Sequence, residues 1–582
     1  MKYNRNIKRL FFYILLCSIS CGISAQTETI ELKFIETSDI HGNYFPFDYI
    51  EQQESKGGLS RVHTYVEQQR TLFGENLLLF DNGDILDGQP SVYYYNYMDT
   101  VSAHLCGEVM NYMRYDAGNF GNHDIETGEA VMNRWARQCA FPILCANLLQ
   151  KSDNSIYTQP YAVYEREGVR IAVLGLTTAA TPAWVCKSLW ENLYFEEMEE
   201  AAQKWMRTIR EKEKPDIVIG LFHSGKDTRI LSDRYTDDFS LQIAQQVPGF
   251  DIIMMGHDHI PYCEKIVNIA GDSVLLVNPG HNGMKVADIS MKLHRVDGQI
   301  TGKQLKGALV EMDSIEPDKA FLEKFNSAHQ TIQQFVSKKI GVFTETITTR
   351  PAYFGSSAFV DFIHELQLDI SGADISFASP LSFDAQIERG NVRIGDMFKL
   401  YKYKNLIYTM ELTGKEIRNY LEESYGIWTQ QMTSPEDHML LLKNSTYGGK
   451  EQFANMYYYF DSAAGIIYTV DVTKEKGEKV NILCMSDGRP FYEDKLYDVA
   501  LTSYRGNGGG ELLTKGAGIS VDELDNRIKT ISENDFRYYL INYIKENKVI
   551  HPRELNHWKF IPEDWVTIAT EKDYQYLFGE KD

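Results

Sequence analysis

The chain has 582 residues, more than one hydrophobic core usually organises, so two or three domains are expected. Apolar residues make up 43% of it and aromatic residues 12%, which excludes an intrinsically disordered chain. Lys and Arg number 59 against 81 Asp and Glu, and the net charge of −22 argues against binding a nucleic-acid polymer over a broad surface. A small anionic substrate stays compatible with this charge if local cations or metal ions reverse its sign.

The first 25 residues predict a secretory signal peptide. Basic residues precede a short apolar run from about Leu10 to Leu16, and small residues continue to Ala25, where we expect cleavage. The run is too short to span a bilayer comfortably, and no later segment is long and apolar enough to be transmembrane. We therefore expect a periplasmic or secreted protein, with an outer-surface lipoprotein anchored through a lipid at Cys21 as the alternative.

From Ile30 to about Ser314, strand-like and helix-like segments alternate. Short apolar runs predict strands at 31–37, 76–81, 141–147, 169–177, 216–222 and 250–255. Amphipathic stretches predict helices at 59–73 and 130–140. This order indicates an α/β domain in which the sheets are layered and the strands are buried.

The pattern changes in the second half of the chain. Residues 316–338 show helical spacing with Pro317 near the start, which predicts a connecting helix. Beyond it we expect helices at 356–370, 413–425 and 533–548, and strands at 374–379, 457–461, 465–472 and 496–504. The predicted domains are a signal peptide at 1–25, a catalytic domain at 26–315, a linker helix at 316–339 and an α+β substrate-binding domain with a C-terminal extension at 340–582.

Five short motifs in the first half each follow, or nearly follow, a predicted strand. They are TSDIHGN with Asp39 and His41, FDNGD with Asp84, GNFGNHD with Asn122, His123 and Asp124, LFHSG with His223, and GHDH with His257 and His259. Carboxylate, amide and imidazole ligands suit divalent ions such as Mn, Zn, Mg or Co. If Asp84 bridged two such ions, they would clamp a phosphoryl group and provide a hydroxide for in-line attack.

The ordered series of motifs resembles the signature of the calcineurin-like metallophosphoesterases. The segments FDNGDILDGQP, LCANLL and NPGHNG, with the organisation of the second half, resemble the bacterial 5′-nucleotidase and 2′,3′-cyclic-nucleotide 2′-phosphodiesterase (3′-nucleotidase) family. The resemblance covers nearly the whole chain after the signal peptide. It implies a four-layer α/β/β/α catalytic domain, a linker helix and a C-terminal α+β domain that binds the nucleoside.

The resemblance also implies roles for individual residues. One metal ion would be held by Asp39, His41, Asp84 and His259, and the second by Asp84, Asn122, His223 and His257. His123 would stabilise charge on the phosphoryl oxygens or the leaving group, and Asp124 would orient and polarise His123. Asp258 is interpreted as structural, whereas His281 is open between ligand, substrate contact and turn residue.

In the second domain the resemblance implies two aromatic rings that sandwich the base. The matching positions are Tyr403, with Asn405, in YKYKN, and Tyr504 in SYRGNGGG, where Arg505 could approach the ligand. The chain departs from many 5′-nucleotidases because residues 379–383 contain no arginine and residues 508–510 are all glycine. This departure looks closer to the cyclic-phosphodiesterase branch.

The sequence therefore predicts a secreted dimetal phosphoesterase that hydrolyses nucleotides to nucleoside and phosphate. The preference among 5′-, 3′- and 2′,3′-cyclic nucleotides stays open. One alternative is a catalytically inactive nucleotide-binding or surface interaction protein on the same scaffold. The other is a phosphoesterase for a different small substrate, such as a sugar nucleotide.

Overall fold

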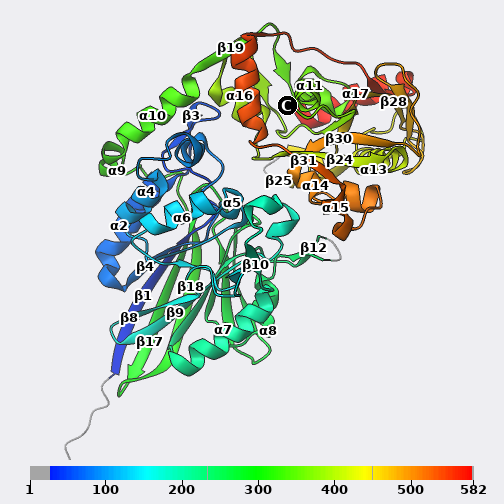
Figure 1. Cartoon of the computed structure of the whole chain (residues 1–582). Helices are drawn as coiled ribbons and strands as arrows, with labels where there is room; N and C mark the ends of the chain where they lie inside the picture. Colours follow the sequence, from blue (N-terminus) through cyan, green and yellow to red (C-terminus); the bar gives the residue numbers. More distant parts are fainter. Residues whose placement is uncertain (1–26, 232–233, 448–449, 580–582) are drawn as a thin grey trace, which may run out of the picture.

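A computed structural model describes residues 27–231, 234–447 and 450–579 of the chain (Figure 1). The predicted signal peptide and Cys21 lie outside the described residues. Within those three ranges, no helix is both long enough and apolar enough to cross a membrane.

The first half of the chain forms two six-stranded sheets with the orders β18–β17–β1–β4–β5–β6 and β15–β16–β14–β11–β9–β8. In sheet order, the strands of the first are Gln299–Glu311, Lys285–Val296, Thr27–Thr37, Leu77–Asp81, Ala117–Asn119 and Ile143–Leu144. Those of the second are Tyr262–Val267, Ser273–Asn278, Ile252–Met255, Ile217–His223, Val169–Thr177 and Tyr161–Arg166. Strands β1, β4, β5 and β6 are parallel, as are β9, β11, β14 and β16, so two sets of carboxyl ends are available for a site.

The two sheets pack face to face, and helices cover both outer surfaces (Figure 1). Side chains such as Phe34, Phe80 and Leu221 fill the space between the sheets. On the outer side of the first sheet lie α2 (Leu59–Phe73), α4 (Leu105–Met113) and α6 (Glu129–Gln138). On the outer side of the second lie α7 (Met198–Lys212) and α8 (Ser240–Gln246). The predicted four-layer α/β/β/α arrangement is confirmed. It could be predicted because strands that are buried on both faces appear in the sequence as continuous apolar runs.

Two short helices, α9 (Lys319–Lys324) and α10 (Asn326–Ser337), lead from the first half to the second. The sequence predicts one continuous helix here, but it is interrupted at Phe325, which is buried against the core of the first domain.

The second half is an α+β structure around a five-stranded sheet of order β27–β21–β30–β24–β31. In sheet order its strands are Ser462–Ala464, Ile375–Ala378, Leu496–Thr502, Ile407–Thr413 and Ile528–Ile531. The predicted helices are present as α11 (Ala358–Ser371), α13 (Gly414–Trp428) and α16 (Phe536–Asn547). The chain ends with β33 (Trp558–Ile561), which pairs with β28 (Ile466–Asp471), and with α17 (Glu563–Phe578).

The strand predicted at 457–461 is wrong. The aromatic composition of this run favours a strand, but the chain turns here, with the Tyr459 amide donating to the carbonyl of Met456. Asp461 at its end is buried and accepts two hydrogen bonds from the guanidinium of Arg505. This tertiary contact overrides the local preference and leaves the tyrosines on a turn.

A buried ion pair joins two strands of the first sheet. Lys33 Nζ on β1 lies 2.6 and 2.7 Å from the two carboxylate oxygens of Asp288 on β17. The same ammonium donates to Ser290 Oγ, and Tyr65 of α2 donates to Asp288. Because both charges are removed from water, losing one partner leaves the other uncompensated.

We expect Lys33→Met to lower the free energy of unfolding of this domain by about 3 kcal/mol, because Asp288 would be left buried and unpaired. Lys292→Met is the matched control, since Lys292 pairs with Glu31 between the same two strands but is half exposed. That control should cost less than about 1 kcal/mol. Urea unfolding followed by circular dichroism measures both, and equal losses in the two variants would contradict the assignment.

Candidate functional site

The predicted site residues of the first domain lie at or just beyond the carboxyl ends of β1, β4, β5, β11 and β14: His223 ends β11, and Asn122, His123 and Asp124 begin the helix that follows β5. Five of them occupy the left-handed region of backbone space, with positive φ at Asp39, His41, Asp84, His257 and His259. For non-glycine residues this conformation is strained, and such strain persists where the surrounding structure holds it in place. Two backbone hydrogen bonds join these loops, from the Asp39 amide to Gly83 and from the His41 amide to Asp84, each at 2.9 Å.

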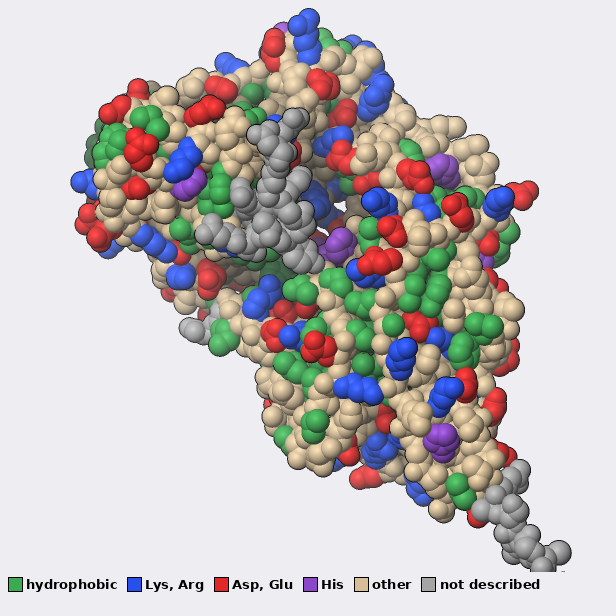
Figure 2. All heavy atoms as spheres, turned by 180° about the vertical axis from the view of Figure 1, so that it is seen from behind, with side chains coloured by type: hydrophobic (Ala, Val, Ile, Leu, Met, Phe, Trp, Pro, Cys, Tyr) green, Lys and Arg blue, Asp and Glu red, His purple; other side chains and the backbone are tan. Residues whose placement is uncertain are grey.

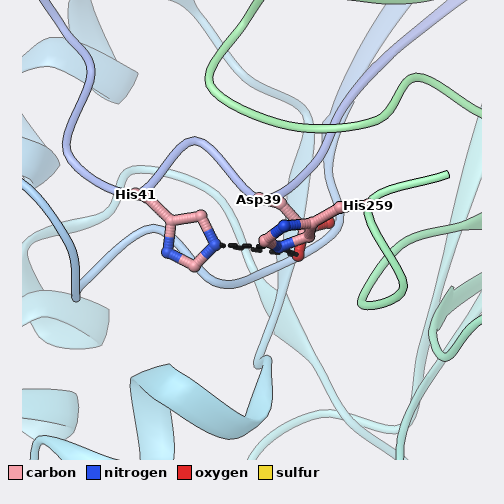
Figure 3. Close-up of side chains that lie close together, drawn as sticks. All are labelled: Asp39, His41 and His259. Atoms are coloured by element: carbon pink, nitrogen blue, oxygen red, sulfur yellow. Dashed lines mark hydrogen bonds and ion pairs between the residues drawn. The ribbon is translucent and has the colours of Figure 1, made fainter. Parts of the chain in front are cut away.

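Asp39, His41 and His259 converge on one point (Figure 3). His259 Nε2 lies 3.1 Å from Asp39 Oδ1 and 3.1 Å from His41 Nε2. Ligand atoms bound about 2.1 Å from one ion are spaced roughly 3.0–3.4 Å apart. In addition, Asp39 Oδ1 is buried without a hydrogen-bond donor. The donor set and its spacing therefore fit a divalent metal ion.

A second group lies beside the first and contains Asp84, Asn122, His223 and His257. His223 Nε2 lies 3.2 Å from Asp84 Oδ2 and 3.2 Å from Asn122 Oδ1. Ligand atoms of Asp84, His223 and His257 lie within 4.8 Å of one another. This group also has the composition of a divalent metal site. All seven ligand candidates named from the sequence are thus found in two adjacent groups.

The outward-facing nitrogens of three histidines are held by oxygen atoms. His41 Nδ1 lies 3.0 Å from the carbonyl of Asp87, and His223 Nδ1 lies 2.7 Å from the carbonyl of Asn82. His257 Nε2 lies 3.0 Å from Asp237 Oδ2. Because each of these nitrogens donates its proton outward, the other nitrogen of the ring faces the site and would offer its lone pair to a metal ion once it has lost its proton.

The charges of the site shift one another's pKa values. Burial alone would lower the pKa of His223, but Asp84 and Asp39 outweigh it and raise the pKa to about 10. Burial would raise the pKa of Asp84, but His223 and His123 hold it well below its usual range. Since protons and metal ions compete for the same imidazole lone pairs, metal binding here releases protons and weakens as the pH falls.

His123 lies outside both groups of ligands. Its Nδ1 is 2.8 Å from Glu126 Oε2, one helical turn away on α5 (Asn122–Glu126), and 3.9 Å from Asp87 Oδ2. Burial would lower the pKa of His123, but Asp84, Glu126 and Asp87 together raise it well above its usual range. The imidazole is therefore held as a cation at the edge of the site.

The partner expected for His123 was Asp124, and the structure gives that position to Glu126. Asp124 is fully buried and points into the loop that follows β4. Its two oxygens accept backbone N–H groups at 2.8–2.9 Å from Asp84, Ile85, Leu86 and Gly121. Asp124 thus fixes the loop that carries Asp84, whereas the spacing of three residues on a helix brings Glu126 beside His123.

The two remaining residues of uncertain role are also placed. Asp258 accepts hydrogen bonds from Asn278 and from the amides of Ile260 and Lys226, which agrees with a structural role. The His281 ring lies against that of His259, with centroids 4.7 Å apart. His281 is therefore part of the wall of the site.

In the second domain, Tyr403 and Tyr504 belong to a cluster of tyrosines. The Tyr403 ring contacts Tyr458 edge-on at 5.8 Å. Burial raises the pKa of Tyr403 most, and the nearby phenols of Tyr457, Tyr458, Tyr504 and Tyr459 raise it further. The sequence interpretation missed the three consecutive tyrosines at 457–459, although a run of three tyrosines is a visible signal.

Arg505 and Asn405 are buried beneath this cluster and form hydrogen bonds to the backbone of its segments. Arg505 is 3% exposed, and its guanidinium is engaged by both oxygens of Asp461 and by the carbonyls of Gly509 and Tyr458. Most of its donors are therefore engaged inside the protein, and a contact between Arg505 and the substrate stays a prediction. Asn405 is buried and accepts a hydrogen bond from the Tyr504 amide, so it links the two aromatic segments.

The tyrosine cluster and the metal-type groups are connected across the two domains. Lys404 Nζ lies 3.1 Å from the carbonyl of Glu126 and 2.7 Å from Tyr97 Oη. Arg229 on β12 (Arg229–Ile230) pairs with Asp237, which also holds His257, and lies close enough to Tyr458 to lower the pKa of that phenol. Seen from behind, the surface is hollowed between the two domains, with basic and histidine side chains at the edge (Figure 2).

Two protein families match the chain. The calcineurin-like phosphoesterase family matches residues 32–261, and the 5′-nucleotidase C-terminal domain matches residues 339–515. A 2′,3′-cyclic-nucleotide 2′-phosphodiesterase/3′-nucleotidase of Yersinia enterocolitica is 25% identical over 92% of this chain and 89% of its own length. A trifunctional nucleotide phosphoesterase of Bacillus subtilis is also 25% identical, over 93% of this chain, which spans only 40% of that larger protein.

Solved structures share the fold over nearly the whole chain. A protein of Staphylococcus aureus has a TM-score of 0.73 and 20% identity, covering 91% of this chain and 100% of the other. A 5′-nucleotidase precursor of Thermus thermophilus has a TM-score of 0.62 and 19% identity, covering 92% of this chain and 100% of the other. At these identities the comparison speaks for the fold alone.

Gly121 generates a prediction about the metal-type groups. A Cβ atom added at this position would lie 2.1 Å from Asp84 Oδ1, so Gly121→Ala must displace that carboxylate. We expect roughly 10–100-fold weaker metal binding, measured by calorimetric titration of metal-stripped protein.

Gly118→Ala is the matched control, because a Cβ there would meet only side-chain ends of Ile143 and Phe141, at 3.0 and 3.4 Å. Metal affinity should stay close to that of the parent protein. If Gly121→Ala bound metal as well as Gly118→Ala does, Asp84 would not be a ligand.

Proposed function

The chain belongs to the calcineurin-like phosphoesterases, a family of metal-dependent enzymes, and carries a 5′-nucleotidase C-terminal domain; on this basis we propose that it is an exported dimetal hydrolase of small nucleotides. The observation that carries the proposal is the convergence of two adjacent metal-type groups beside a cationic histidine, facing a cluster of tyrosines. The signal-like pattern of residues 1–25 supports export.

The residues that would hold the first ion are Asp39, His41, Asp84 and His259, and those for the second are Asp84, Asn122, His223 and His257. Two divalent ions so held would neutralise phosphoryl charge and lower the pKa of water, which makes hydroxide available for in-line attack on phosphorus. The anchored outer nitrogens support this proposal because they hold the inner nitrogens toward the site without rearrangement.

His123 would act on the substrate itself. Held as a cation by Glu126, its Nε2–H would donate to a phosphoryl oxygen or protonate the leaving oxygen. Glu126 would keep the proton on Nδ1 and so direct Nε2 at the reacting group. Asp124 would act indirectly, by fixing the loop of Asp84.

The tyrosine cluster would bind the base. Stacking needs only a π face and contributes roughly 1–3 kcal/mol per base, so the cluster would accept several bases. The two lysines that flank Tyr403 would supply positive charge near the phosphate, in a chain that lacks the arginine at 379–383. Lys402 contacts the Tyr403 ring and lies close enough to His281 to affect its pKa.

An inactive scaffold predicts the loss of at least one ligand or of the acid group, whereas all seven candidates and His123 are present. A sugar nucleotide would need the same stacking surface, so it stays a candidate substrate. Within the nucleotides, the identity to a cyclic phosphodiesterase over 92% of this chain favours testing the 2′,3′-cyclic series first.

The proposal is tested with 5′-, 3′- and 2′,3′-cyclic nucleotides and a sugar nucleotide, assayed for phosphate release with Mn, Zn, Co and Mg added separately. We expect hydrolysis of at least one nucleotide series, abolished by EDTA and restored by one of the ions. Activity that is insensitive to chelation would contradict the dimetal mechanism. Turnover of none of these substrates would contradict the nucleotide assignment.

Glu126→Gln separates the role of His123 from metal binding. The variant keeps the size of the side chain but removes one of the charges that raise the pKa of His123, the one hydrogen-bonded to its Nδ1. We expect kcat to fall by about 10²–10³-fold, with the bound metal content unchanged. Steady-state kinetics and metal analysis on the same sample measure both. A parallel loss of metal and activity would instead make Glu126 part of the metal site.

A further inference from the structure

A third group with the composition of a metal site lies in the second domain. Asp361 and His364 belong to α11, and His557 directly precedes β33. The three side chains belong to residues that are 1%, 0% and 6% exposed. One ligand atom from each lies within 4.8 Å of the other two. None of the three takes part in the strand-end site.

His557 is the member that lacks partners. Both of its ring nitrogens are buried and neither makes a hydrogen bond of ordinary geometry to another described residue, although the backbone of Ala463 lies close enough to raise the pKa of the ring. The carboxylate oxygen Oδ1 of Asp361 lies 3.9 Å from His557 Nδ1, too far for a hydrogen bond. A neutral imidazole carries one N–H group and one lone pair, and each needs a partner when it is buried. A buried nitrogen without a partner is destabilising.

His364 is oriented for binding through one nitrogen. Ser376 Oγ donates to Gln367 Oε1 at 2.7 Å, so it accepts the proton of His364 Nδ1 at 2.9 Å. This leaves the lone pair on Nε2, which faces Ser462 Oγ at hydrogen-bond distance, 3.1 Å. Histidine ligands of metal ions are held in the same way, by a hydrogen bond on the nitrogen that does not bind the ion.

Asp361 is fixed through only one of its oxygens. Oδ2 accepts hydrogen bonds from Ser356 Oγ at 2.6 Å and from the Leu555 amide at 2.8 Å. Oδ1 faces His557. The carboxylate is thus positioned by its neighbours and keeps one oxygen for a ligand.

We propose that Asp361, His364 and His557 bind one divalent transition-metal ion such as Zn²⁺. This ion would link the C-terminal extension to α11. Two imidazoles and a carboxylate are a ligand set of zinc and related ions, and Ser462 or a water molecule completes the coordination. Because all three residues are buried, the role of the ion is structural.

The location explains what the ion would achieve. The match to the 5′-nucleotidase C-terminal domain ends at residue 515, and His557 lies in the extension that follows. β31 of this extension is already part of the five-stranded sheet, and α16 packs on the domain core. The last part of the extension, which begins near His557, joins the domain through the parallel pair β28–β33, four residues long, and through α17. A metal ion between α11 and the start of β33 would link the two chain segments at the point where this last part begins.

The test uses the full chain with and without Asp361→Asn, each in the parent protein and in an Asp84→Ala background that weakens the strand-end site. The asparagine keeps an oxygen acceptor for Ser356 and Leu555 but removes the charged ligand. After loading with Zn²⁺ and removal of the excess, Asp361→Asn should carry about one zinc ion fewer per chain in both backgrounds. Inductively coupled plasma mass spectrometry measures the content.

His551→Gln is the matched control, since His551 is an exposed histidine of the same extension whose ring lies within hydrogen-bond distance of Thr344 Oγ1, at 3.2 Å. It should keep the parent zinc content. A chelator should lower the melting temperature of the Asp84→Ala protein, and this shift should vanish when Asp361→Asn is added. His557→Gln replaces Asp361→Asn if circular dichroism shows that the latter is unfolded.

Equal zinc contents with and without the substitution, in both backgrounds, would overturn the proposal. This outcome is independent of the proposed reaction. The measured quantity is the difference in zinc content between proteins with and without Asp361→Asn, and any metal retained by the strand-end site is the same in both. A zinc difference without a melting shift would overturn the structural role.

Discussion

The hydrogen bonds of Asp124 are the interaction on which the strand-end site depends. One buried carboxylate accepts four backbone N–H groups, three from the loop after β4 and one from the loop after β5. The first loop carries Asp84, and the second carries Asn122 and His123. Because charged acceptors form strong hydrogen bonds to amides, Asp124 sets the separation between the loop that carries Asp84 and the segment that carries Asn122 and His123. Gly121 lets these loops approach, since no Cβ fits between it and Asp84.

The site combines a strained backbone at five residues with buried carboxylates whose charge is compensated by nearby imidazoles. Five candidate ligands have positive φ, a conformation that each would avoid in an unfolded chain. Gathering Asp39 and Asp84 in a buried place is also unfavourable unless cations face them. In the folded chain this compensation comes from imidazoles such as His223, whose pKa is raised to about 10. Divalent ions would provide the same compensation more strongly. The ligand geometry and the pKa shifts thus have the same cause, the burial of carboxylates and imidazoles next to one another.

The sequence predicted most of the catalytic domain, because buried parallel strands are apolar runs and site residues follow their ends. It also identified all seven candidate ligands through the order of the motifs. It missed contacts between residues that are distant in the chain. The partner of Arg505, Asp461, lies 44 residues away. Glu126 was missed for a different reason. Asp124 is next to His123 in the sequence, but adjacent residues on a helix point in different directions, whereas the residue three positions on lies on the same face.

The buried pair of Arg505 and Asp461 also explains how the second domain could present a stacking surface. A cluster of tyrosines on a turn would collapse onto itself unless its backbone were fixed. Arg505 fixes it by donating to the carbonyls of Tyr458 and Gly509 while Asp461 holds its charge. Tyr504, which precedes Arg505 and whose ring lies against Gly509, is positioned by the same contacts. Arg505 therefore positions the two segments that carry Tyr458 and Tyr504.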